Sequence, residues 1–477
     1  MPDQRDKTVR LLVPGQARPD QRNRIYKISH PRGKQGLIIT VSVALVLILL
    51  VNILAYFYLQ TYPPYTNAFR IWDSFSGIQS LDKRVDTLLL GDSSSGENLD
   101  VGAFSDRLGG QAFSLSIYGG MSVLTDAWLL SDYIQKFGPP HNVVFCILSD
   151  GYSATHTVEL MAAPSLNWDY WDQLGVAPAW KDGELRNLFF TKYLVMYSYS
   201  DIFRGHLYKF WDLFDKTRDP MVPFNSYTLG DKSKQATMDI TTRQPTSYFN
   251  EFNPSLDTTN AIQYMTDLAR QQRFQLYFLF PPEWDEAVNA GLRQPILEAQ
   301  VKYLSRFIDP TFVHIFRNAS LTFNRDQIQN QAHLRPGSDH VKTESDLSGI
   351  ISIQNQLTAE RSQPLKVDSL KLDRNIYLPE DVPTVKLTIS NLGKAGVTGS
   401  VSCLVKPSGE TDGYWVKRAP ASSFALEADG KLNLNLKLTV GDLEKAGVYD
   451  LVVFLRQDVG NLSNEIRVEL PDKLVVE

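Results

Sequence analysis

The chain is poor in cysteine, with Cys146 and Cys403 as the two thiols among 477 residues. Two distant cysteines, each inside an apolar segment, exclude a scaffold stapled by disulfides. The sequence also lacks the Cys and His spacing of a zinc site, a Gly-rich phosphate loop and a long internal repeat. We therefore expect no metal and no cofactor.

Excess positive charge is missing as well. Lys and Arg number 48 against 53 Asp and Glu, which leaves a formal net charge of -5 at pH 7. Proteins that hold nucleic acids neutralise phosphates with clustered Lys and Arg, so this balance argues against a nucleic-acid partner. The length is sufficient for two or three domains beyond any membrane anchor.

One long apolar stretch, residues 37–59, contains no charged residue. At about 1.5 Å per residue it can cross a hydrocarbon core about 30 Å thick. The preceding residues 1–36 carry nine Lys or Arg against three Asp, which is typical of a cytoplasmic flank. A cleaved signal peptide is the alternative, but the stretch is too long and no small-residue cleavage site follows it. We predict a single-pass anchor in the cell (inner) membrane, with a cytoplasmic N-terminus and extracytoplasmic main domains.

Residues 83–360, which follow a linker at 60–82, alternate short apolar segments with amphipathic ones. Such a pattern is typical of a mostly parallel sheet covered on both faces by helices. A sheet of this kind carries its site at the carboxyl ends of the strands. Strands are predicted at 85–90, 111–117, 142–148, 275–280 and 313–316, and helices at 123–137, 257–272 and 292–308.

Residues 152–255 interrupt this alternation with many aromatic side chains, among them Trp168, Trp171 and Trp211. Such rings line carbohydrate- or acyl-binding grooves, rest at membrane interfaces, or fill the core of a helical subdomain. We interpret the segment as a helical insertion with its own aromatic core, and the groove as the alternative.

The C-terminal residues 365–477 follow a different pattern. Val385, Leu387 and Ile389 alternate with polar neighbours, and later segments repeat this period of two between Gly-containing turns. Short strands of this kind predict an all-β sandwich. It resembles immunoglobulin-like modules appended to surface enzymes, and its role is either spacing or the binding of a polymer or partner.

The chemically informative residues follow the first predicted strand, at 91–96, where the sequence reads GDSSSG. A serine on a sharp turn between strand and helix presents its hydroxyl outside the sheet, beside backbone N–H groups able to face an oxyanion. Such a serine needs a base. We predict that His333, beyond the last strand at the same edge of the sheet, is the base for Ser93; His340 is the competing candidate.

Three segments, LLLGDSS, FSLSIYGGMS and NQAHLRPG, occur in this order, with FLFPPEW between the last two. Together they resemble the SGNH/GDSL hydrolase superfamily, within it the membrane-anchored extracytoplasmic branch of alginate O-acetyltransferase-like and teichoic acid D-alanyl transfer-like proteins. The resemblance implies a flavodoxin-like three-layer α/β domain. It also implies Ser93 as nucleophile, His333 as base, and Gly119 or Gly120 in the oxyanion hole.

Two positions depart from the pattern of that family. Asn330 stands where the family has the Asp that orients the base, and an amide holds the ring but stabilises imidazolium poorly. Asp326 or Asp339 is a candidate replacement, or the site works as a Ser–His dyad. Asp150 occupies the third block, which lacks the oxyanion-hole Asn, and is a candidate for binding the substrate or the second-block loop.

Three functions stay open on these residues. The first is acyl transfer onto, or removal from, a secreted or cell-surface polysaccharide, with Ser93 acylated and transfer favoured over hydrolysis. The second is a scaffold on a catalytically degraded hydrolase fold in polysaccharide export or modification. The third is a glycan-binding protein. The expected partners are the membrane, a polysaccharide or cell-wall glycan and, by the resemblance, a multi-spanning membrane acyltransferase.

Overall fold

The computed structural model describes residues 33–61, 74, 77–116, 123–155, 168–175, 186, 189–190, 194, 196, 252–330, 333–374, 376–410, 412, 415–441, 443, 446–460 and 462–477. These residues belong to two compact units, Met1–Phe57 and Tyr58–Glu477. Most of the predicted basic tail and of the aromatic insertion at 152–255, together with part of the linker at 60–82, lies outside the described residues.

The first unit is described through helix α1 (Gly33–Thr61). Its window Gly36–Phe57 is 22 residues long and has a mean hydropathy of 3.0. At about 1.5 Å per residue this window is about 33 Å long, which matches a hydrocarbon core. Leucine side chains along it are exposed, for example Leu45 at 61%. The prediction of one N-terminal helix long and apolar enough to cross a membrane is confirmed.

The second unit contains a parallel sheet of five strands in the order β2-β1-β3-β4-β5. Each neighbouring pair is parallel, as the sequence pattern predicts. This order is that of flavodoxin-like doubly wound sheets, in which the chain changes direction of winding between β1 and β3. The strands are β1 (Thr87–Gly91), β2 (Ala112–Ser114), β3 (Asn142–Cys146), β4 (Gln275–Leu279) and β5 (Val313–Ile315).

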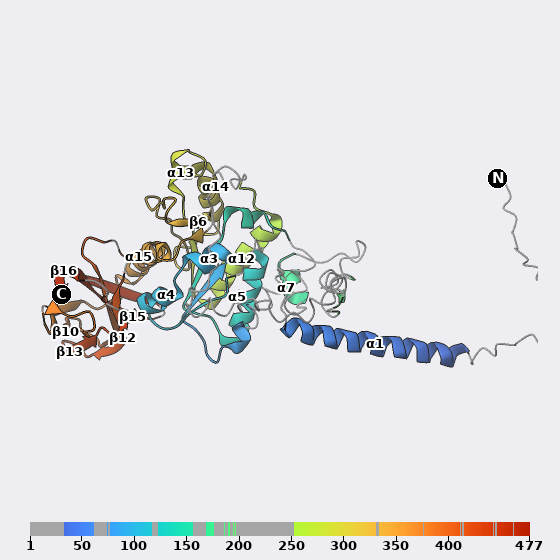
Figure 1. Ribbon diagram of the computed structural model, residues 1–477, viewed down its shortest axis with the longest axis horizontal. Helices are drawn as coiled ribbons and strands as arrows, with labels where there is room; N and C mark the ends of the chain where they lie inside the picture. The colour runs from blue at the N-terminus through green and yellow to red at the C-terminus, as the bar shows by residue number, and fades with distance from the viewer. Residues whose placement is uncertain are drawn as a thin grey trace, which may run out of the picture. The chain divides into compact units, whose positions relative to one another are not determined.

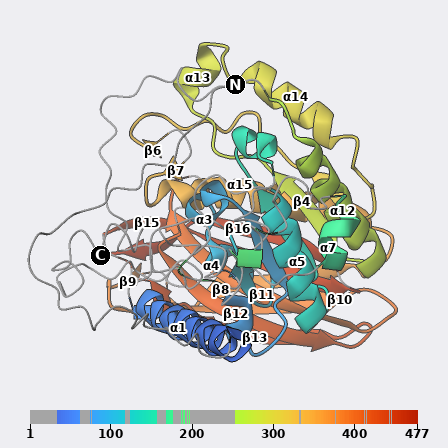
Figure 2. The same cartoon turned by 90° about the vertical axis from the view of Figure 1, so that its right-hand side faces the viewer.

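Helices cover both faces of this sheet. The helices α5 and α12 lie side by side in both views, on the face that also carries α14 (Figures 1 and 2). The opposite face is covered by α4 and α15. The bounds are α4 (Val101–Leu108), α5 (Val123–Phe137), α7 (Trp168–Gln173), α12 (Leu256–Gln272), α13 (Asp285–Asn289), α14 (Gln294–Leu304) and α15 (Ser338–Thr358).

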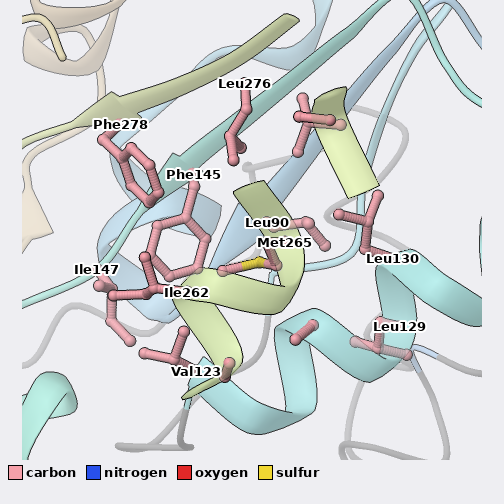
Figure 3. Packing of buried hydrophobic residues seen from close by; sticks show 14 of the residues in the cluster. Leu90, Val123, Leu129, Leu130, Phe145, Ile147, Ile262, Met265, Leu276 and Phe278 are labelled. Carbon is pink, nitrogen blue, oxygen red and sulfur yellow. The ribbon is translucent and has the colours of Figure 1, made fainter. Parts of the chain in front are cut away.

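The sheet forms two cores because successive residues of a strand point to opposite faces. Leu88 and Leu90 belong to one buried cluster, whereas Leu89 between them belongs to the other. A strand that is buried on both faces must therefore be apolar at every position, as Leu88, Leu89 and Leu90 of β1 are. Figure 3 shows the first cluster, where Leu90, Phe145, Leu276 and Phe278 of three adjacent strands meet Val123, Leu129 and Leu130 of α5 and Ile262 and Met265 of α12.

The C-terminal part of this unit consists of two β sheets with a common core. The strand orders are β13-β10-β8 and β14-β12-β11-β15-β16-β9, and pairing is antiparallel except between β16 and β9. Val385 and Leu387 of the first sheet share a buried cluster with Val401 and Leu455 of the second. The predicted antiparallel β region is confirmed. The strands are β8 (Leu365–Leu372), β9 (Ile376–Tyr377), β10 (Thr384–Asn391), β11 (Val397–Pro407), β12 (Lys417–Leu426), β13 (Lys431–Lys437), β14 (Val440–Gly441), β15 (Gly447–Val459) and β16 (Leu462–Val476).

A buried ionic cluster joins the α/β part to the β sheets. Arg107 of α4 pairs with Glu344 of α15 and, at 2.8 Å, with Glu465 of β16. Its guanidinium also lies 3.6 Å from the centre of the Phe454 ring, and Trp415 donates from Nε1 to Glu344 at 2.8 Å. The side chain of Arg107 is 3% exposed. A charge this deeply buried is tolerated because it is paired on two sides.

Replacement of Arg107 by Ala should destabilise the protein by about 3–5 kcal/mol, because two carboxylates lose their buried partner. The matched control is Arg374→Ala, since Arg374 is 52% exposed and pairs with Asp381 at the surface, where a pair contributes about 0–1 kcal/mol. Urea unfolding of the full-length protein in detergent, followed by tryptophan fluorescence, measures both. Equal losses in the two variants would contradict the prediction.

Candidate functional site

The topology places two polar segments together at the carboxyl edge of the sheet. Ser93 follows β1 directly, and the 3₁₀ helix η2 (Ser149–Ser153) follows β3. Because β1 and β3 are neighbours at which the winding reverses, a crevice is expected outside their carboxyl ends. The predicted nucleophile thus lies at the position where doubly wound sheets bind ligands.

Gly91, the last residue of β1, makes the sharp turn before the serines. Its φ of 126° is in the range that favours glycine, and a Cβ built there would lie 1.8 Å from the carbonyl oxygen of Cys146 in β3. A side chain is therefore excluded. The Gly91 N–H donates to the buried carboxyl of Asp126 at 3.0 Å, which fixes the peptide before the turn.

Asp92 caps the helix that follows, α3 (Ser93–Asn98). Its carboxylate accepts from the N–H of Ser94 at 2.8 Å and from the N–H of Leu148 at 3.0 Å. One buried side chain thus starts the helix and ties it to the end of β3. Burial raises the pKa of Asp92 to about 6, and its hydrogen bonds only partly offset that rise.

The three consecutive serines of this turn have different partners. Ser94 Oγ donates to Asp92 at 2.5 Å, and Ser95 Oγ accepts from Ser116 at 2.9 Å. Ser93 Oγ instead lies 2.7 Å from Nε2 of His333. Ser93 is therefore the serine of this turn that has a base within hydrogen-bond distance, which nucleophilic chemistry requires.

His333 is held by a small hairpin of β6 (Ile328–Asn330) and β7 (His333–Leu334). In this hairpin Asn330 is the register partner of His333. The adjacent Leu334 is buried with Trp284 in a local apolar cluster, and its N–H donates to Asn98 Oδ1 at 2.7 Å. This bond ties the strand of His333 to the helix of Ser93.

The surroundings of His333 keep its ring in the neutral form. The side chain is 15% exposed, and its Nδ1 lies 3.4 Å from Oε2 of Glu97, whose side chain is 10% exposed. Burial lowers the pKa of His333 to about 4. The ring is therefore neutral at pH 7 and able to take a proton from Ser93.

Other residues expected at the site have different surroundings. Asp150 is exposed in η2, close enough to Asp92 to contribute to the rise in its pKa. Asp339 accepts from the Gly337 N–H at 2.8 Å and Asp326 is exposed. His340, the competing base, pairs with Asp100 at 2.9 Å.

Three predicted site residues lie, in whole or in part, outside the portion of the chain that the structure describes. Gly119 and Gly120, expected in the oxyanion hole, lie outside the described residues, as does the side chain of Asn330. Their roles stay predictions.

The sequence analysis did not identify two residues of α3 that contact His333 or its strand. Glu97 is four residues after Ser93 and Asn98 is five after it, so the first shares a helix face with Ser93. Both residues stand in the segment GDSSSGEN, shortly after Ser93. Their spacing alone does not indicate a role, because the residues they contact lie more than 230 positions away in the sequence.

A third unpredicted residue, Arg293, lies near the end of β3. Its side chain is buried at 5% exposure and donates to Ser149 Oγ at 3.3 Å. Burial lowers its pKa below the usual value for arginine, against the opposing effect of Glu283. A guanidinium therefore borders the same edge of the sheet as Ser93.

No family model matches this chain, and no curated protein matches it. Solved structures with partial likeness include the sporulation control protein Spo0M from Bacillus subtilis, at 15% identity, with 24% of this chain and 49% of that chain covered. Another is a FixG-related protein from Vibrio parahaemolyticus, at 20% identity, with 24% of this chain and all of that chain covered. The TM-scores are 0.17 and 0.16, which carry no argument about fold or function.

The lowered pKa of His333 makes stability depend on pH. An unfolded histidine titrates near 6.5, whereas the folded ring stays neutral down to about pH 4. The unfolded chain therefore binds the extra proton, and the free energy of unfolding falls as the pH drops from 6.5 towards 4. Between pH 7 and about 4.5, the wild type should lose up to about 2–3 kcal/mol more than His333→Gln, and less where the nearby Glu97 carboxylate favours the charged ring.

Urea unfolding of both proteins at a series of pH values measures this difference. Asp92 and the acidic groups that do not contact His333 are present in both proteins, so their titration cancels in the comparison. Identical pH dependence in the two proteins would show that His333 titrates normally in the folded state.

Proposed function

We propose that the protein is a membrane-anchored serine O-acyltransferase or esterase that acts on acyl groups of a secreted or cell-surface polysaccharide. The observation that carries this proposal is the 2.7 Å distance between Ser93 Oγ and His333 Nε2. A neutral, buried imidazole at this distance is the arrangement that converts an unreactive hydroxyl into a nucleophile.

The reaction proceeds in two halves. His333 Nε2 takes the proton of Ser93 as Oγ attacks the ester carbonyl, and the resulting imidazolium returns this proton to the departing alcohol. The acyl group is then bonded to Ser93. In the second half, His333 takes a proton from an incoming hydroxyl, which attacks the acyl-enzyme, and Ser93 recovers the proton. A glycan hydroxyl gives transfer, and water gives hydrolysis.

The resemblance to SGNH hydrolases supports this reaction, together with the strand order 2-1-3-4-5 and the position of Ser93 at the reversal of winding. Since the Ser94 N–H donates to Asp92, the oxyanion needs other donors. The resemblance assigns this role to the second block, at Gly119 or Gly120.

The anchor and its flanking charges support the location. Helix α1 is long enough to cross the bilayer once, and the positive residues before it favour a cytoplasmic N-terminus. The α/β and β-sandwich parts then face the outside, where polysaccharides are modified. An anchored enzyme stays beside an acyl donor delivered through the membrane, which fits a multi-spanning acyltransferase as partner.

A fluorophosphonate probe, which bonds to activated serines, tests the proposal on the full-length protein in detergent. Labelling is expected in the wild type and should fall at least 100-fold in Ser93→Ala and in His333→Ala. The matched controls are Ser348→Ala, an exposed serine of α15, and His340→Ala, whose ring pairs with Asp100; both should label like the wild type.

Hydrolysis of a small acetyl ester by the same proteins separates an enzyme from a scaffold. Wild-type protein that is folded, unlabelled and inactive would refute the proposal and favour the scaffold. Polysaccharide binding that survives Ser93→Ala without any esterase activity would favour a glycan-binding protein.

A further inference from the structure

The acidic side chain that the structure pairs with His333 comes from the helix of the nucleophile. Glu97 Oε2 lies 3.4 Å from His333 Nδ1, and Ser93 Oγ lies 2.7 Å from Nε2 on the other side of the ring. We infer that Glu97 is the positioning carboxylate of the site, which completes a Ser93–His333–Glu97 triad in place of a carboxylate at position 330. This inference rests on the proposed function and names the residue that orients its base.

The chemistry of the ring favours such a group. In a neutral imidazole one nitrogen carries the proton and the other accepts. To accept from Ser93, Nε2 must be the bare nitrogen, so Nδ1 must carry the proton. A carboxylate beside Nδ1 favours this tautomer and stabilises the imidazolium formed during the reaction. The amide of Asn330 supplies no such charge.

The local fold holds Glu97 in this place through its neighbours. Ser93 and Glu97 are four residues apart on α3, so their side chains project from the same side of the helix. Asp92 caps the start of this helix, and Asn98 at its end binds the N–H of Leu334, next to the base. One short helix thus presents the nucleophile, the carboxylate and the anchor of the base.

The other candidate carboxylates are occupied elsewhere or exposed. Asp339 accepts from the Gly337 N–H, and Asp326 is exposed beyond β5. Asp150 is exposed in η2 on the side of β3. Glu97, with a side chain that is 10% exposed, is shielded from water together with the ring it faces. Its effect on the imidazolium is therefore weakly screened.

The test compares variants of the full-length protein in detergent by the rate of fluorophosphonate labelling and of acetyl-ester hydrolysis. Glu97→Gln, which keeps the shape and removes the charge, should lower kcat/KM by about 10²- to 10⁴-fold. Glu97→Asp, which keeps the charge, should retain at least ten times the rate of Glu97→Gln. Glu298→Gln, an exposed glutamate of α14, should match the wild type.

Asn330→Ala decides between the two positions for the orienting group. Its loss of rate should be at least tenfold smaller than that of Glu97→Gln. A loss in Asn330→Ala as large as in Glu97→Gln would overturn the inference, because position 330 would then orient the ring. Glu97→Gln with a rate within threefold of the wild type would overturn it as well.

Chemical rescue separates a positioning role from a merely structural one. Glu97→Ala should regain at least tenfold in rate when formate is added at neutral pH, because a small carboxylate can enter the space left by the side chain. Ser93→Ala should gain nothing from formate. Wild-type protein that neither labels nor hydrolyses esters would refute the proposed function itself, whereas active wild type without formate rescue of Glu97→Ala would refute the triad alone.

Discussion

The candidate site depends on one buried hydrogen bond, from the Leu334 N–H to Asn98 Oδ1. Asn98 ends α3 and Leu334 lies next to His333, so this bond sets the distance between two segments that are far apart in sequence. An unpaired buried N–H or amide costs about 1–3 kcal/mol, and the bond is therefore strongly favoured once the hairpin closes on the helix. It holds the strand of His333 against the helix of Ser93, and Ser93 Oγ lies 2.7 Å from His333 Nε2.

The turn at the end of β1 contains a glycine with a positive φ and lies against two carboxyl groups that are unfavourable to bury. Gly91 has a backbone conformation that favours glycine, and Asp92 and Asp126 are carboxyls with raised pKa values because burial disfavours their charge. Each of the two carboxyls accepts from a backbone N–H of this turn. These groups reduce the local stability of the turn that presents Ser93. Such a local loss is common where a protein holds a functional group in a defined position.

The sequence predicts the apolar part of this structure well and the polar part poorly. The five parallel strands and α5 (Val123–Phe137) follow from apolar runs and helical spacing, and Ser93 and His333 follow from motifs. Helix α15 was not predicted, because buried charged residues such as Lys342, Glu344 and Asp346 interrupt its apolar pattern. Those charges are tolerated because they are paired: Lys342 with Asp346 within the helix, and Glu344 with Arg107 of α4. The contacts of Glu344 with Arg107 and of Glu97 with His333 exist only after distant segments meet, so the sequence alone does not indicate them.

Polar contacts between the β sandwich and two helices of the α/β part hold the two parts together. Helix α15 begins at Ser338, five residues after His333, and near its other end Asn355 exchanges hydrogen bonds with the backbone of Glu465 in β16 at 3.1 and 2.8 Å. The Glu465 side chain binds Arg107 of α4. The sandwich therefore braces the two helices that cover one face of the sheet, and one of them follows the hairpin of the base. A module joined to the α/β part through buried charges is a structural support of that part, whether or not it also binds a polymer.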